Sequence, residues 1–103
     1  MNHEIKSFYV KALDVVQNVV EIPDIFGSNK EEFVDARSIL IYILSSKGIS
    51  DMEISILTGL TRQCVNKLKN SYKYRKNKWS YISNLQQISN ELATNHFRSN
   101  DIM

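Results

Sequence analysis

Apolar residues recur with the period of an α-helix along nearly the whole chain. They fall three or four positions apart from Ile5 to Val20, again from Phe33 to Leu44, and again from Trp79 to Leu92. With three glycines and one proline in 103 residues, the chain has too few turn residues for an all-β protein, which needs a turn about every ten residues. We therefore predict an all-α fold, with one compact domain of five helices over residues 1–94 and a polar, frayed tail over residues 95–103.

Glycine, proline and capping residues divide this pattern into separate helices. Pro23 ends the first helix. Ser28 and Glu31 have the spacing of a capping box, in which each side chain bonds to the other residue's backbone N–H, so we expect the second helix to start there. Gly48 can adopt the left-handed conformation that is common after a helix end, and we expect the second helix to stop at this residue.

A helix-turn-helix is predicted over residues 51–74. A second capping box, formed by Ser50 and Glu53, opens a short helix. Gly59 can adopt the left-handed conformation that a tight turn needs, and Thr61 can cap a second helix that ends near residue 74. Two short helices joined by a glycine turn are the layout of this motif.

The side chains of this segment divide into an inner and an outer set. Facing inward are Ile54 and Ser55 on the first helix and Leu60, Val65 and Leu68 on the second. Six side chains, none of them acidic, face outward: Thr61, Arg62, Gln63, Asn66, Lys67 and Asn70. Because such groups bond to base edges and phosphates, we predict that the second helix enters the major groove of double-stranded DNA. The alternative is an αα-hairpin whose outer face is merely soluble.

Each predicted DNA contact has a role. Arg62 and Gln63 are expected to read base edges, with Thr61 and Asn66 assisting. The expected phosphate contacts are Lys67, Lys69, Asn70, Lys73 and Arg75.

The charges are distributed unevenly along the chain, although their sum is only +2. Residues 1–53 carry five basic and nine acidic side chains, a net charge of −4, whereas residues 54–90 carry seven basic and no acidic ones, a net charge of +7. Residues 91–103 add −1. A basic segment of this kind attracts duplex DNA, because binding releases the counterions condensed on the phosphates.

Three stretches of the chain, Ala36–Tyr42, Ser50–Ile54 and Gly59–Val65, resemble the C-terminal DNA-binding domain of the bacterial replication initiator DnaA. The resemblance covers about residues 34–70 and implies an all-helical fold with a helix-turn-helix of the Trp-repressor-like class. The family's Arg-Asp-His-Thr-Thr signature is replaced here by Leu60–Cys64, so we expect a different target sequence. The chain has no glycine-rich phosphate loop, so the initiator's ATPase activity is not expected.

Arg37 lies within the apolar arc of its helix, between Ile41 and Leu44 on a helical wheel. A charge in that place must extend to the surface, pair with an acid, or reach a phosphate. The resemblance, which places an arginine at this position, favours a DNA-facing or supporting role. A structural ion pair with an acid such as Glu53 is the alternative.

Tyr72, Tyr74, Trp79 and Tyr81 interleave with lysines and an arginine. Such interleaving can stack the bases of single-stranded DNA or RNA, which makes residues 72–81 an alternative nucleic-acid site. We favour the structural interpretation, in which the aromatic rings close the core and the cations lie outside. The period that Trp79 shares with Ile82 assigns this residue to packing.

Other functions find little support in the residues. Cys64, the only cysteine, reads as a half-buried packing residue, and with His3 and His96 at the two ends it offers no metal-ligand spacing. No catalytic arrangement, cofactor motif or small-molecule site is evident, so an enzyme is not expected. No apolar run reaches the ~20 residues of a membrane span, and residues 1–20 lack the layout of a signal peptide.

We therefore expect a cytoplasmic, nucleoid-associated regulator of transcription or replication. Twelve isoleucines and ten asparagines fit an AT-rich gene of bacterial or phage origin. The wide apolar arc of residues 5–20 suggests a homodimer seam, and an interaction or adaptor module is the rival function.

Overall fold

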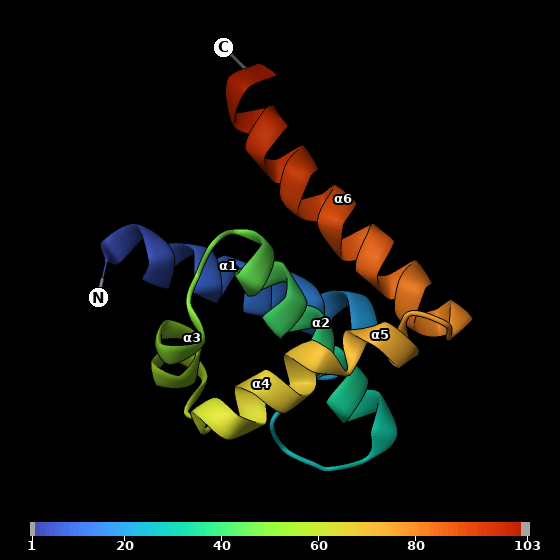
Figure 1. The fold of residues 1–103 in the computed structure, drawn as a ribbon. Helices are drawn as coiled ribbons and strands as arrows, with labels where there is room; N and C mark the ends of the chain where they lie inside the picture. The colour runs from blue at the N-terminus through green and yellow to red at the C-terminus, as the bar shows by residue number, and fades with distance from the viewer. Residues whose placement is uncertain (1, 102–103) are drawn as a thin grey trace.

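The computed structural model describes the backbone of residues 2–101 and the side chains of residues 2–93. This part of the chain is all-helical, as predicted, with no strand (Figure 1). The helices are α1 (His3–Val20), α2 (Glu31–Ser46), α3 (Asp51–Thr58), α4 (Arg62–Asn70), α5 (Tyr72–Arg75) and α6 (Trp79–Asp101). Together α4 and α5 form the single helix expected up to about residue 74, interrupted only at Ser71.

The second helix, α2, is the centre of the fold. Eight of its sixteen residues are buried, and it packs against each of the other five helices. Leu40 and Leu44 are fully buried there, together with Val16 of α1, Val65 of α4 and Ile88 of α6. A helix that is apolar on most sides is stable only when other elements cover it, and the remaining helices provide that cover.

The end of α2 follows the expected glycine signal. Gly48 has a φ of +87°, and its N–H bonds to the Ser45 carbonyl at 2.9 Å. The Ile49 N–H reaches back to the Leu44 carbonyl at 3.2 Å, which completes a Schellman motif. These bonds satisfy carbonyls that the helix end leaves open.

The capping box predicted at Ser28 and Glu31 is wrong. Lys30 is the N-cap residue of α2 and makes no side-chain capping bond, while the Ser28 hydroxyl accepts from the Lys30 N–H at 3.1 Å. The Glu31 carboxylate instead pairs with Lys78, a residue far away in the sequence. A full positive charge is a stronger partner for a carboxylate than one backbone N–H, so the long-range pair replaces the local one.

The last helix, α6, packs on α1 and α2 and then extends away from the other helices (Figure 1). Tyr81, Leu85 and Ile88 are its buried side chains. The helix continues through residues 95–101, which the sequence analysis assigns to a frayed tail, and residues 102 and 103 lie outside the described part.

Candidate nucleic-acid interface

The turn between α3 and α4 has the predicted local geometry. Ser50 and Glu53 form the capping box, with the Glu53 N–H donating to the Ser50 hydroxyl at 3.2 Å and the Ser50 N–H donating to the Glu53 carboxylate at 3.1 Å. Gly59 has a φ of +80°, a conformation that side-chain-bearing residues rarely adopt. The Thr61 hydroxyl accepts from the Cys64 N–H at 3.1 Å and caps α4. The orientation of α4 is therefore set by bonds at both sides of the turn.

The inward positions of the two helices also agree with the prediction. Ile54 and Val65 are completely buried, Leu68 is nearly so, and Leu60 packs against the core. The hydroxyl of Ser55 donates to the Leu60 carbonyl at 2.5 Å and holds the turn against α3. The two short helices thus share one apolar interior with α2.

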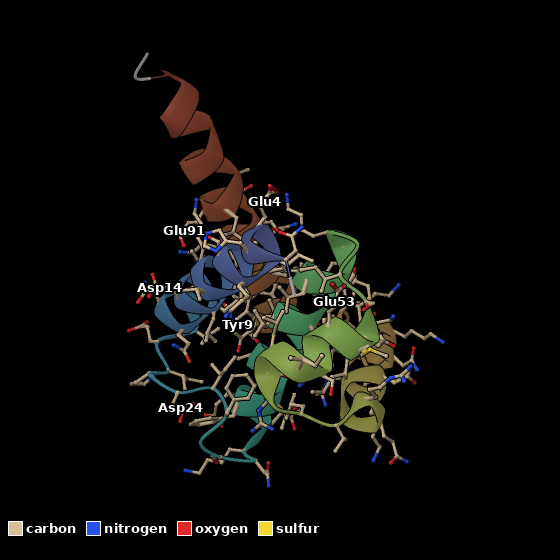
Figure 2. All side chains as sticks on the ribbon, turned by 90° about the vertical axis from the view of Figure 1, so that its left-hand side faces the viewer. Glu4, Tyr9, Asp14, Asp24, Glu53 and Glu91 are labelled. Atoms are coloured by element: carbon tan, nitrogen blue, oxygen red, sulfur yellow. The ribbon has the colours of Figure 1, made fainter. Side chains whose placement is uncertain are left out.

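The outer face of α4 is polar and exposed along its whole length. Each of its six predicted side chains is solvent-exposed: Thr61, Arg62, Gln63, Asn66, Lys67 and Asn70. Figure 2 shows Asp14 and Asp24 on the side of α1 and its following loop, away from the ribbon of α4. These two acidic side chains therefore lie away from the outer face of α4.

One acidic residue, Asp51, borders this outer face. Its carboxylate pairs with Lys69 at 3.0 Å and accepts from the Asn66 amide at 3.5 Å. The bond from Lys69 holds the pKa of the Asp51 carboxyl below its ordinary value. The side-chain amide of Asn70 donates to the side-chain oxygen of Asn66 at 3.0 Å, so the Asn66 side chain is held by both Asp51 and Asn70. Lys69 is therefore neutralised, whereas Arg62 and Lys67 have no ion-pair partner among the described side chains.

Two cations of the basic stretch are committed to the fold. Arg75 pairs with Asp35 of α2, and Lys78 pairs with both Glu31 and Asp35. The bond between Lys78 and Glu31 holds the pKa of Glu31 below its usual range and raises the pKa of Lys78. Lys73 remains exposed. Of the predicted phosphate contacts, Arg75 is thus occupied by a structural ion pair.

A buried polar cluster joins α2, α4 and α6 behind the interface. The Ser38 hydroxyl lies 2.9 Å from the Tyr81 hydroxyl, 3.3 Å from that of Ser71 and 3.2 Å from the Leu68 carbonyl. Arg75 donates to the Ser71 hydroxyl at 2.8 Å. The Ser71 hydroxyl also turns inward and donates to the Leu68 carbonyl at 2.7 Å, at the end of α4. Sequence periodicity does not reveal this cluster, since Ser38 bonds to residues 30 or more positions away in the chain.

Arg37 neither faces outward nor forms an ion pair with an acid among the described side chains. Its side chain is buried, and it donates to the carbonyls of Ile25 at 2.7 Å and of Ser28. Glu53, the expected acid partner, is engaged in the capping box. Arg37 therefore fastens the loop between α1 and α2 and is not part of the exposed face of α4.

The aromatic stretch divides into two pairs. Tyr81 is buried, and the Tyr72 ring stacks on Tyr42 with a centroid distance of 4.2 Å. Tyr74 and Trp79 are exposed instead, Trp79 by 83%. The prediction that Trp79 packs in the core is wrong, because α6 begins at this residue and its apolar face starts only at Tyr81 and Ile82.

The remaining predictions concern other sites. Cys64 is half-buried, as expected of a packing residue. On α1, Val10 is the one strongly exposed large apolar side chain, and the homodimer seam stays a prediction. No helix among the described residues is both long and apolar enough to cross a membrane, and no group of three His, Cys, Asp or Glu side chains forms a possible metal site in that part.

Comparisons with protein-family models, with curated proteins and with solved structures found no match to this chain. The resemblance to the DnaA DNA-binding domain accordingly stays a prediction from its motif residues.

Proposed function

We propose that this protein binds double-stranded DNA by placing α4 in the major groove. The observation that carries the proposal is the outer face of α4, where six exposed polar or basic side chains stand on a helix fixed by its buried inner face. Arg62 and Gln63 lie in the first turn of α4, the part of a recognition helix that contacts base edges. A guanidinium can form two hydrogen bonds with the edge of guanine, and a glutamine amide can form two with the edge of adenine.

The basic side chains without an ion-pair partner would provide affinity for the phosphate backbone of DNA. Arg62, Lys67 and Lys73 are exposed, and the whole stretch from residue 54 to residue 90 contains no acid. Their charges would steer the α4 side toward a polyanion. A protein with this activity would act in the cytoplasm as a small transcription or replication regulator.

Arg62→Ala and Lys73→Ala are expected to affect DNA binding in different ways. Loss of Arg62 should reduce affinity by about 1–3 kcal/mol for preferred sequences and relax the choice of base. Loss of Lys73 should weaken binding to all duplexes alike. It should also reduce the slope of log affinity against log salt concentration by about one unit, the loss of one phosphate contact. Selection of bound fragments from random duplex DNA, followed by titration at several salt concentrations, measures both effects. If both variants bind and select DNA as the wild type does, α4 is not the reading element.

Asp51→Asn should strengthen duplex binding. The substitution removes the carboxylate that neutralises Lys69 and adds one net positive charge beside the outer face. We expect a gain of about three- to tenfold at low salt and a salt slope steeper by about one unit. Glu4→Gln, which changes the charge equally in the first turn of α1, is the matched control. An equal gain in both variants would mean that only net charge matters, and that Asp51 does not border the binding surface.

A further inference from the structure

The corner between α5 and α6 exposes two aromatic rings. Trp79 is 83% exposed and Tyr74 is 63% exposed, although tryptophan is usually well buried. Their neighbours in sequence, Tyr72 and Tyr81, supply the rings that pack inside. Neither exposed ring therefore belongs to the core of this domain.

The corner is fastened to the rest of the fold. The Asn77 N–H bonds to the Tyr74 carbonyl at 3.3 Å, and the Lys78 N–H bonds to the Arg75 carbonyl at 2.9 Å, which closes the turn. The side chains of Arg75 and Lys78 both pair with Asp35 of α2. The exposed rings are thus carried on a backbone held in place, so little ordering is needed for them to receive a ligand.

The charges of the corner favour an anionic ligand. Arg75 and Lys78 are occupied by their ion pairs, but Lys73 and Lys76 are exposed and have no acid partner among the described side chains. The Lys76 ammonium lies 5.8 Å from the centre of the inner Tyr72 ring, and the Arg75 guanidinium lies 5.6 Å from the centre of the exposed Tyr74 ring, so cations and aromatic rings adjoin at this corner.

The chemistry of this corner fits unpaired nucleotides better than a protein surface. A protein interface usually has an apolar centre, but the other strongly exposed large apolar side chains among the described residues lie on different helices, Val10 on α1 and Met52 and Ile56 on α3. Separate aromatic rings with lysines between them are typical of single-strand sites, where the rings stack on bases and the cations bind phosphates.

We propose that the corner between α5 and α6 is a second nucleic-acid site, which binds single-stranded DNA or RNA by stacking bases on Trp79 and Tyr74. Lys76 binds a flanking phosphate. The proposal does not depend on duplex binding by α4, because different side chains carry it.

The test uses Trp79 itself, because it is the only tryptophan in the chain. The full chain is titrated at low salt with oligothymidylate and with oligouridylate of about ten nucleotides, within the range of known single-strand site sizes. A base stacked on the indole should quench its fluorescence, and added salt should reverse the quenching. A hairpin duplex of the same length serves as the comparison ligand.

Variants are measured by the anisotropy of a labelled oligonucleotide. Trp79→Ala should weaken single-strand binding about tenfold, the loss of one stacked base, whereas Trp79→Phe should retain most of it. Ile56→Ala, which removes an exposed apolar side chain from α3, is the matched control and should change nothing. Trp79 is so exposed that its replacement should leave the fold intact.

The possible outcomes separate the two proposals. Indole emission that no oligonucleotide changes, or unaltered affinity in Trp79→Ala, overturns the single-strand site even if Arg62-dependent duplex binding is found. Quenching by single strands without duplex binding supports this site and refutes the role of α4. Trp79-dependent binding of a protein, with none of nucleic acid, also overturns the proposal.

Discussion

Tyr81→Ala is expected to lower the free energy of unfolding by about 3–5 kcal/mol, the usual cost of removing a large buried aromatic ring. Tyr81 is 1% exposed, and its ring lies 6.2 Å from that of Tyr72. Its loss would leave a cavity where α6 meets α2. Since a small domain is stable by only about 5–15 kcal/mol, this one change should remove a large part of the total.

Tyr81→Phe is the matched variant, because it keeps the ring and removes the hydroxyl group alone. We expect a cost of about 1 kcal/mol, since the Ser38 hydroxyl keeps its bonds to Ser71 and to the Leu68 carbonyl. Urea unfolding followed by circular dichroism measures both variants. Equal costs would show that the hydroxyl, rather than the packing of the ring, carries the effect, contrary to this expectation.

The free energy of unfolding of the wild type and of Tyr81→Phe can also be compared at alkaline pH. Burial raises the pKa of Tyr81 above its ordinary value of 10.0, and burial also raises the pKa of Tyr9. The unfolded chain therefore loses these phenol protons first, so stability is complete below about pH 10 and falls as the pH rises further. Tyr81→Phe should make that fall less steep, because one of the shifted groups is gone.

The largest effect on binding is expected from the double substitution Arg62→Glu, Lys67→Glu. Both side chains are exposed on α4, and neither supports the core. Reversing both charges removes two contacts to DNA and adds two repulsive groups, so duplex affinity should fall at least about 100-fold near 0.1 M salt. Glutamate at position 62 lies in the first turn of α4, where a negative charge is favourable. Glutamate at position 67 lies in the last turn and costs only about 0.3–1 kcal/mol, so the fold should remain stable. Anisotropy titration with a labelled duplex measures the change.

The control for this variant is Lys6→Glu, Lys11→Glu on α1. It changes the net charge by the same amount, and both lysines are exposed. A comparable loss of affinity in the control would mean that binding follows total charge rather than the α4 face, and would count against the proposed function.

The parts of the fold that sequence predicts correctly depend on residues close together in the chain. The bonds of Ser50 with Glu53 and of Thr61 with Cys64 join residues only three positions apart, and the positive φ of Gly59 concerns a single residue. Local chemistry is sufficient there, because no distant group competes for the same atoms. The exposed side of α4 follows from the same helix once its two ends are known.

The parts that sequence does not predict depend on distant partners. Glu31 leaves its expected cap because Lys78 lies beside it, and the basic stretch loses two of its free cations to Asp35 in the same way. Counting charges along residues 54–90 cannot detect such pairing. The exposure of Trp79 does not follow from the helical period, because the period does not show at which residue the helix first meets the core.

The six outward residues of α4 make no contribution to the hydrophobic core. Substitutions at the other five positions leave the buried side chains unchanged and should alter stability by no more than about 0.5 kcal/mol each, whereas replacing Thr61 also removes the cap of α4 at a cost of about 1 kcal/mol. Under the proposed function, the recognised DNA sequence could therefore change through single substitutions without a prior gain in stability. The same separation makes it a practical scaffold for a library in which only the outer face of α4 is randomised.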